Sequence, residues 1–182
     1  IVHPLSMACF ISALEIKDDN LFSTILLHDV PEDCGVEIEN LPVCNEVKLA
    51  VKCLTVTPLK TDRSKIETKR RYFAGLLDSK YAIICKALDR YNNLVDMPFA
   101  LKPDAIGKNV AETETLLLPI LKEAKEKWAD MSGLLFILRT IIRDTNNILK
   151  LQYHSLTLKV RMNYLLNFLI LLNSYDLCLL QY

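Results

Sequence analysis

Glycine is scarce in this chain, at only 4 of 182 residues. Sandwiches and barrels need glycine at the many tight turns that join their strands, so the scarcity favours an all-α fold. Hydrophobic residues make up 51% of the chain and charged residues 24%, which is a globular composition and argues against intrinsic disorder. A chain of this length is expected to form one domain with its own core.

The charge balance and the apolar segments argue against two classes of partner. Lys and Arg number 22, and Asp and Glu also number 22. Nonspecific binding to DNA or RNA depends on a basic surface, so a nucleic-acid partner is not expected. The apolar segment 165–172 is shorter than the roughly 18 to 20 residues of a membrane-spanning helix, and Asn167 interrupts it. We therefore expect no membrane partner either. The sequence leaves the oligomeric state open.

The cysteines and the first residues indicate a cytoplasmic protein. None of the six cysteines forms a C-x-x-C pair, and most lie in apolar runs, so free thiols in a reducing compartment are favoured over disulfides. The chain opens without the basic and apolar regions of a signal peptide. It also begins with Ile1 rather than Met, so we expect further residues upstream.

Apolar periodicity and boundary residues predict a succession of helices. We expect them over residues 4–14, 21–29, 46–54, 65–77, 81–92, 108–128 and 132–149. Asn20 and Asn45 are the expected N-caps of two of them. Residues 97–107 contain two prolines and are expected to form a connection, and Pro119 is expected to kink the long helix around it.

The chain changes character near residue 150. Asp176 is the only acidic residue after Asp144, and Leu, Asn and Tyr dominate the last segment. We therefore predict a domain over 1–150 and a separate C-terminal segment over 151–182. That segment could be a last core helix, a partner-binding helix or a tail foreign to the domain.

Four ionisable side chains lie close together where the helix over 21–29 should end: His28, Asp29, Glu32 and Asp33. If the helix continued, His28 would face Glu32 and Asp29 would face Asp33. Acidic residues oppose the dipole at the C-terminal end of a helix, and a bound cation would remove that objection. An imidazole nitrogen and a carboxylate oxygen are ligands that suit Mn, Fe, Zn or Co.

Two further candidate ligands lie at the edges of other expected helices. His3 precedes the helix that begins at Pro4, and Asp89 follows the apolar run 83–88. A single His-Asp pair occurs often by chance. The order His, His-Asp, Asp in an all-helical chain is much less common, so the four residues are treated as one candidate metal site.

Several spaced blocks resemble those of the HD phosphohydrolase superfamily, and in particular the hydrolase domain of RelA/SpoT enzymes and the small alarmone hydrolases. The blocks are HP at 3–4 with Ala8, LLHDVPEDC at 26–34, KALDRYNNL at 86–94, AETET at 111–115 and LPIL at 118–121. They occur in the family's order and span residues 3 to about 148. The resemblance implies an all-α HD-domain helical bundle.

The resemblance also implies an activity, namely Mn²⁺-dependent removal of the 3′-pyrophosphate of guanosine tetra- or pentaphosphate, the alarmones of the stringent response. The implied metal ligands are His3, His28, Asp29 and Asp89. The residues implied to orient and deprotonate the attacking water are Glu32 and Asp33. The implied nucleotide or phosphate contacts are Asn93, Lys65 and Lys108.

Two departures from the family pattern leave alternatives open. Pro31 replaces a small apolar residue between the His-Asp and Glu-Asp pairs, and it can change the placement of Glu32 and Asp33. Asn92 stands where the bacterial bifunctional enzymes have His, which matters less because the animal homologue has Tyr there. The alternatives are an HD phosphohydrolase for another nucleotide and an inactive HD module that binds or regulates.

Overall fold

The computed structural model describes residues 2–56 and 65–153, and every regular element in these two ranges is helical. The first range holds α1 (Val2–Ala13), α2 (Asp19–Leu27), α3 (Val30–Cys34), η1 (Ile38–Asn40) and α4 (Asn45–Leu54). The second holds α5 (Lys65–Gly75), η2 (Leu76–Asp78), α6 (Lys80–Ala100), α7 (Pro103–Glu112), η3 (Thr113–Leu117), α8 (Leu118–Lys127), η4 (Ala129–Met131) and a helix over 132–153. The expected all-α fold is confirmed.

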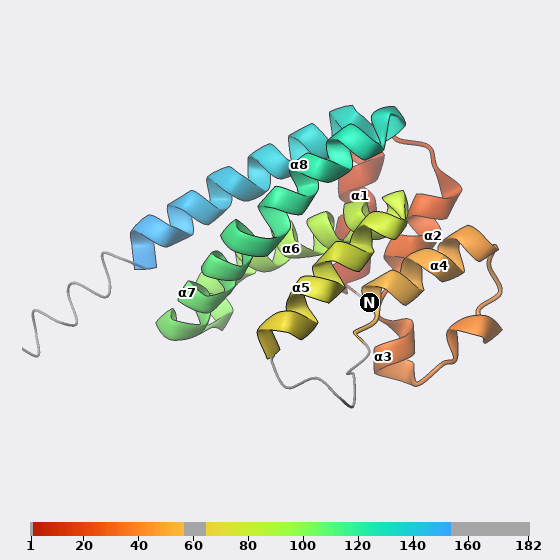
Figure 1. Cartoon of the computed structure of the whole chain (residues 1–182), viewed down its shortest axis with the longest axis horizontal. Coiled ribbons are helices and arrows are strands. Elements are labelled where there is room, and N and C mark those ends of the chain that lie inside the picture. The colour runs from red at the N-terminus through yellow and green to blue at the C-terminus, as the bar shows by residue number, and fades with distance from the viewer. Residues whose placement is uncertain (1, 57–64, 154–182) are drawn as a thin grey trace, which may run out of the picture.

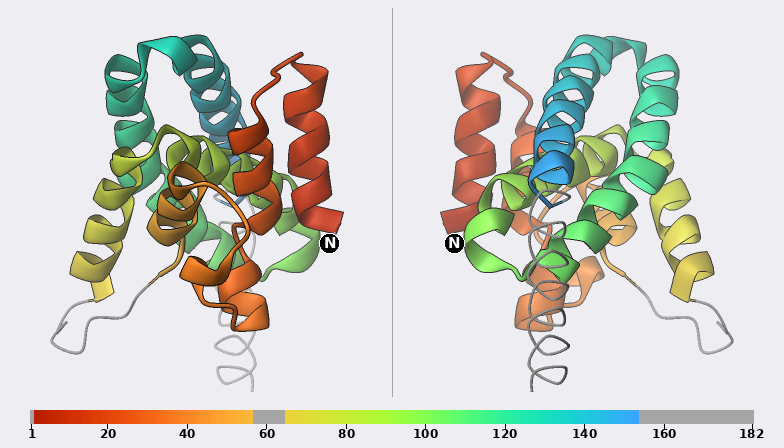
Figure 2. Two further views of the ribbon diagram at one scale, coloured as in Figure 1. Left: turned by 90° about the vertical axis from the view of Figure 1, so that its right-hand side faces the viewer. Right: turned by 90° about the vertical axis from the view of Figure 1, so that its left-hand side faces the viewer.

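The central element is α6, which packs against α1, α2, α4 and α8. Ser79 begins it, because the Ser79 hydroxyl accepts a hydrogen bond from the Ala82 N–H at 3.4 Å and so satisfies one unpaired donor of the first turn. In Figures 1 and 2, α1 and α2 lie side by side, and α8 and the helix over 132–153 run antiparallel to each other. The central helix can therefore present side chains to several helices that are distant in sequence.

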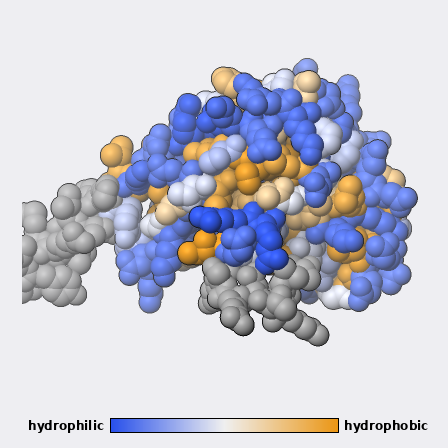
Figure 3. Space-filling view, in the orientation of Figure 1, coloured by the Kyte–Doolittle hydropathy of each residue, from blue (hydrophilic) through white to orange (hydrophobic). Residues whose placement is uncertain are grey.

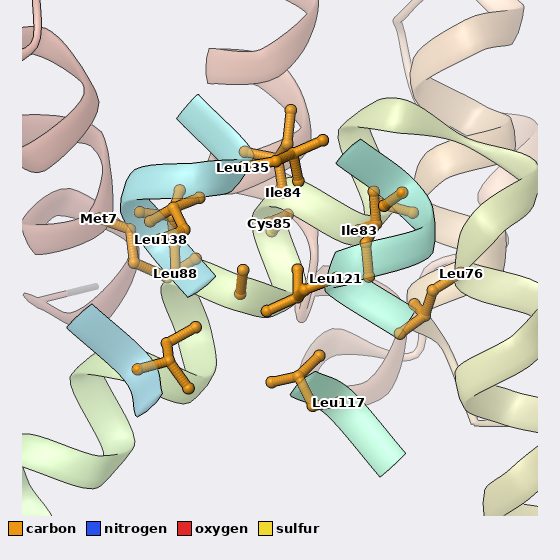
Figure 4. Packing of buried hydrophobic residues seen from close by; sticks show 14 of the residues in the cluster. Met7, Leu76, Ile83, Ile84, Cys85, Leu88, Leu117, Leu121, Leu135 and Leu138 are labelled. Atoms are coloured by element: carbon orange, nitrogen blue, oxygen red, sulfur yellow. The ribbon is translucent and has the colours of Figure 1, made fainter. Parts of the chain in front are cut away.

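The main core is a large apolar cluster built around α6 (Figure 4), and a smaller one holds Leu41, Val47 and Val51. Ile83, Ile84 and Leu88 of α6 are at most 1% exposed, and they pack with Met7 of α1 and Leu121 of α8 in the same cluster. Burial of one such side chain contributes about 1.5–3 kcal/mol, so this cluster fixes the position of α6 against its neighbours. On the face shown in Figure 3, hydrophilic residues cover most of the surface and apolar residues gather in a band near the middle.

Two predicted helix caps are wrong. The N-cap of α2 is Asp18, whose carboxylate accepts a hydrogen bond from the Leu21 N–H at 3.1 Å. The Asn20 side chain, within α2, donates instead to Glu46 on α4 at 3.0 Å. Cys44 occupies the N-cap position of α4 but its side chain does not cap the helix; its thiol donates to Asn20 Oδ1 at 3.3 Å. Both Asx residues lie one or two positions inside the helix they were expected to cap.

The predicted connection over 97–107 is also wrong in extent. Helix α6 continues through Pro98 to Ala100, and α7 begins at Pro103. Pro98 lies in the last turn of α6, which ends two residues later, and Pro103 lies in the first turn of α7, where its missing N–H is not needed. The helix expected over 108–128 consists of α7, a π-helical turn, η3, and α8, and Pro119 lies in the first turn of α8.

Three further predictions can be compared with the described residues. The described cysteines are free thiols, as expected: Cys9, Cys34, Cys44, Cys53 and Cys85. No helix within 2–56 and 65–153 has the length and apolar character needed to cross a bilayer. The helix over 132–153 continues past Lys150. Cys178 and residues 154–182 of the predicted C-terminal segment lie outside the described residues.

Candidate metal centre

Helix α1 places His3 one turn before its buried face. Met7 and Ile11 are 0% exposed, and His3 precedes Met7 by four residues, so the three side chains follow the same face of the helix. Pro4 suits the first turn, where its missing N–H would have no partner inside the helix. The imidazole of His3 is therefore held at the edge of the core by the packing of α1.

Helix α2 buries His28 at its C-terminal end. Leu21 and Ile25 are 0% exposed, and His28 continues their apolar face with only 5% exposure. The Nδ1 atom of His28 lies 2.8 Å from the Ile25 carbonyl oxygen and donates to it. This hydrogen bond leaves Nε2 of the neutral ring as the atom with a free electron pair, as in metal-binding histidines whose other nitrogen is anchored.

Helix α6 supplies Asp89 and two partners for its carboxylate. Lys86, one turn before Asp89, donates to Oδ2 at 2.6 Å. Asn93, one turn after it, donates to Oδ1 at 2.7 Å. Asp89 itself is 9% exposed. The helical spacing of these residues puts all three side chains on one face and fixes the carboxylate from both sides.

The three helices bring His3, His28 and Asp89 together. One potential ligand atom from each lies within 4.8 Å of the other two. The His3 Nε2 and Asp89 Oδ1 atoms are 3.1 Å apart, and the centroids of the two imidazole rings are 5.8 Å apart. We call these three residues the HHD cluster. They come from three helices that are well separated in sequence, so the fold alone makes them neighbours.

The HHD cluster carries a marked electrostatic bias toward a charged carboxylate. Burial alone would raise the pKa of Asp89, but the hydrogen bond from His3 and the Lys86 charge outweigh it and hold that pKa well below its usual range. The hydrogen bond to Asp89 likewise raises the pKa of His3 against the opposing effect of burial. Asp89 is therefore an anion at neutral pH and attracts a cation into the cluster.

The surroundings of His28 Nε2 match a cation site. This atom is buried and makes no hydrogen bond to any described residue, yet it lies 3.0 Å from Oδ2 of Asp29. A nitrogen electron pair and a carboxylate oxygen repel each other at that distance, so the contact calls for a proton on Nε2 or a cation beside it. Two imidazole nitrogens and two carboxylates form a donor set that divalent transition metals accept. The residues present fit such an ion.

Glu32 and Asp33 occupy a different environment, on the short helix α3. Both side chains are exposed, and Glu32 Oε1 accepts a hydrogen bond from the Val56 N–H at 2.9 Å. The continuous helix that would have paired them with His28 and Asp29 does not form, because α2 ends at Leu27 and α3 begins at Val30. Pro31 lies in the first turn of this new helix, a position that proline favours.

Two pockets open beside the HHD cluster. One, of about 310 Å³, is lined by residues that include His3, Asp29, Asp33 and Cys34. The other, of about 270 Å³, is lined by residues that include Asn93, Arg90, Asp96 and Asn109. Asn93 therefore connects Asp89 to the second pocket, because it donates to the carboxylate and also lines the pocket wall.

For the two lysines expected to contact phosphate, Lys65 and Lys108, the structure describes no contact with the HHD cluster. Lys65 is the first residue of α5, and its side chain lies outside what the structure describes. Lys108 is exposed on α7, and no hydrogen bond or ion pair within 2–56 and 65–153 joins it to the HHD cluster. The structure therefore adds no contact to either residue's expected role.

The sequence pattern alone did not reveal the basic side chains behind Asp89. Lys86 was part of a recognised block, and its spacing of three residues from Asp89 could have revealed the contact. Arg90 donates to Glu112 Oε1 at 2.6 Å and to Asn109 Oδ1 at 3.0 Å, and Lys69 also donates to Glu112. These partners come from three helices, and no local spacing could have shown that they meet.

Comparisons with known proteins give no further assignment. No family model matches this chain, and a search of curated proteins gives no match.

Proposed function

We propose that this chain is a metal-dependent phosphohydrolase whose metal is held by the HHD cluster together with Asp29. One observation carries the proposal: three helices converge on His28 Nε2, a buried nitrogen without a hydrogen bond, and surround it with His3, Asp29 and Asp89. His3, Asp89 and the Nδ1 atom of His28 have hydrogen-bond partners among the described residues, so His28 Nε2 is the buried nitrogen of the HHD cluster that a cation would satisfy.

A divalent metal at this position would lower the pKa of a bound water to about 7 and neutralise phosphate charge. His28 is oriented for this role by the Ile25 carbonyl, and Asp89 is oriented by Lys86 and Asn93. Hydrogen bonds of this kind fix ligand geometry in metal sites and raise affinity. The proposed metal is Mn²⁺, which is the metal implied by the resemblance to the RelA/SpoT hydrolases.

Glu32 and Asp33 are the proposed acceptors of the proton from the attacking water. Asp33 lines the same pocket as His3 and Asp29, so its carboxylate borders the proposed metal position. The water oxygen forms a bond to phosphorus, the bond between phosphorus and the 3′-oxygen breaks, the carboxylates take the proton of the water, and the released 3′-oxygen takes a proton from solvent. Two neighbouring carboxylates share such a role, and neither is assigned alone.

The proposed substrate is guanosine tetra- or pentaphosphate, and the group removed is its 3′-pyrophosphate. This choice rests on the resemblance of the spaced blocks. The pocket lined by Asn93, Asp96 and Asn109 supports it, because amide and carboxylate groups can pair with the edge of a purine base while Met97 contacts its face. The same pocket borders Asp89 through Asn93, so a nucleotide bound there would have phosphate close to the metal.

The test is release of pyrophosphate from guanosine tetraphosphate by the purified chain with Mn²⁺. His28→Ala, which removes the buried ligand, is expected to abolish both Mn²⁺ binding and turnover. The double variant Glu32→Gln/Asp33→Asn is expected to keep Mn²⁺ binding and lose turnover. Hydrolysis of a different nucleotide in the same assay would replace the substrate assignment and retain the HD chemistry. Mn²⁺ binding without turnover of any nucleotide would make the chain a regulatory module.

A further inference from the structure

A third pocket lies behind Asp89, between α5, α6 and the end of α7. Its volume is about 220 Å³, and its lining includes Lys69, Lys86, Arg90, Glu112 and Tyr72. We call it the basic pocket. It carries three cationic side chains and one carboxylate. Asp89 lies outside this lining but pairs with Lys86. When Asp89 and Glu112 are counted against the three cations, one positive charge remains in excess at neutral pH.

The cations of the basic pocket have donors to spare. Lys69 donates to Glu112, Lys86 donates to Asp89, and Arg90 donates to Glu112 and Asn109. An ammonium group has three N–H donors and a guanidinium has five, so these contacts use fewer than half of the donors available. The arrangement holds the cations in place and leaves capacity for a further oxygen-rich anion.

Arg90 gives the strongest sign of an absent partner. The residue is 6% exposed, and its Nε atom is buried without a hydrogen bond among the described residues. A buried N–H of a charged group without an acceptor costs about 1–3 kcal/mol or more, so such a donor is expected to meet an acceptor in the functional state. Arg90 lines the basic pocket, where an anion could supply that acceptor.

The basic pocket adjoins the proposed active site at two points. Lys86 lies in its wall and is bonded to the candidate ligand Asp89 at 2.6 Å. Val56 also lies in its wall, and the Val56 N–H is bonded to Glu32. An anion in the pocket would therefore be next to both the proposed metal ligand and the proposed base.

We propose that the basic pocket binds a phosphate group, namely the terminal phosphate of the pyrophosphate that leaves. The identity of that phosphate carrier rests on the proposed function, whereas the capacity for phosphate rests on the pocket alone. Phosphate presents several acceptor oxygens and a charge of about two, which matches clustered ammonium and guanidinium donors. Tyr72, whose ring lies 5.8 Å from Lys86 Nζ, closes one side.

The experiment is calorimetric titration of the full chain with inorganic pyrophosphate in the presence of EDTA, so that no metal takes part. Lys69→Gln removes a rim cation and is expected to weaken pyrophosphate binding about tenfold, the loss of one charge-assisted hydrogen bond. Glu112→Gln removes the competing carboxylate and is expected to tighten binding several-fold. Lys122→Gln, at an exposed lysine of α8, is the matched control and should change affinity less than twofold.

An anion site predicts opposite changes in pyrophosphate affinity for Lys69→Gln and Glu112→Gln, whereas a structural ion-pair network does not. If Lys69→Gln and Glu112→Gln weaken binding alike, or if the unaltered chain binds no pyrophosphate, the proposal is wrong. Circular dichroism of each variant checks that it is folded. His28→Ala is expected to bind pyrophosphate normally in EDTA. Normal pyrophosphate binding by a chain that hydrolyses no nucleotide would overturn the proposed function and leave the basic pocket as a phosphate site.

Discussion

The HHD cluster and helix α3 lie next to each other and differ in how firmly they are held. His28 and Asp89 are 5% and 9% exposed, and each has a hydrogen-bond partner on its own helix. Helix α3 has five residues, none of them buried, and the contact described for Glu32 is one hydrogen bond to Val56. The HHD cluster is fixed by the core, whereas α3 lies on the surface of the protein.

This difference fits a division of tasks. Metal ligands must be preorganised, because each misplaced donor lowers affinity. A pair of carboxylates that takes a proton from water needs access to solvent and substrate, so an exposed helix suits it. Substitutions in the HHD cluster should therefore change metal binding and stability together, and substitutions in α3 should change turnover alone.

The largest effect is expected from Asp89→Asn. The substitution removes a ligand charge and leaves Lys86 buried beside a neutral amide, so the free energy of unfolding should fall by about 3 kcal/mol. Mn²⁺ affinity, measured by calorimetry, should fall more than about 100-fold, beyond the effect of losing an outer hydrogen bond. Asp96→Asn, an exposed carboxylate on the same helix, is the control for both quantities. Retention of Mn²⁺ affinity by Asp89→Asn would remove Asp89 from the metal site.

The second prediction concerns α3. Glu32→Gln/Asp33→Asn should lower the turnover number by about 10²–10⁴-fold, the usual contribution of general base catalysis. The free energy of unfolding should change by less than about 0.5 kcal/mol, because both side chains are exposed and the amide oxygen introduced by Glu32→Gln can still accept from the Val56 N–H. Chemical denaturation and Mn²⁺ titration measure the two controls. A large loss of stability would show that α3 is held as firmly as the HHD cluster and would contradict the difference between the two regions.

The sequence was sufficient to predict those features of the two regions that depend on local residue spacing. Periodic apolar residues predicted the helices that carry His3, His28 and Asp89. The helix expected to begin at Pro4 begins two residues earlier, at Val2, so His3 lies inside α1. The expected end near Asp29, just before Pro31, is two residues beyond the observed end of α2 at Leu27, but local spacing could not show that α3 begins anew at Val30. It also could not place Glu112 beside Arg90, since that contact depends on how α7 crosses α6.

A smaller effect is expected from Lys86→Met. The aliphatic part of the lysine is retained and its hydrogen bond to Asp89 Oδ2 is lost, so Mn²⁺ affinity should fall about 10–100-fold. His3 and Asn93 still hold Oδ1, and the fold should survive. Lys86→Arg should restore part of the affinity because it keeps the charge and a donor. An unchanged affinity in Lys86→Met would confine the fixed region to the HHD cluster itself.

The smallest effect is a pH dependence of stability at Glu112. Burial would raise its pKa, but hydrogen bonds from Lys69 and Arg90 outweigh burial and lower the pKa below its ordinary value of 4.5. A carboxyl group with a lowered folded-state pKa stabilises the fold above its unfolded pKa, and the stabilisation is lost as the pH falls below 4.5 toward the folded value. For a partly solvated ion pair we expect about 1 kcal/mol. Glu112→Gln lacks this contribution, so its unfolding free energy should differ from that of the unaltered chain at pH 7 and approach it at pH 3. A constant difference between pH 7 and pH 3 would show that the Glu112 ion pairs add nothing to the framework behind Asp89.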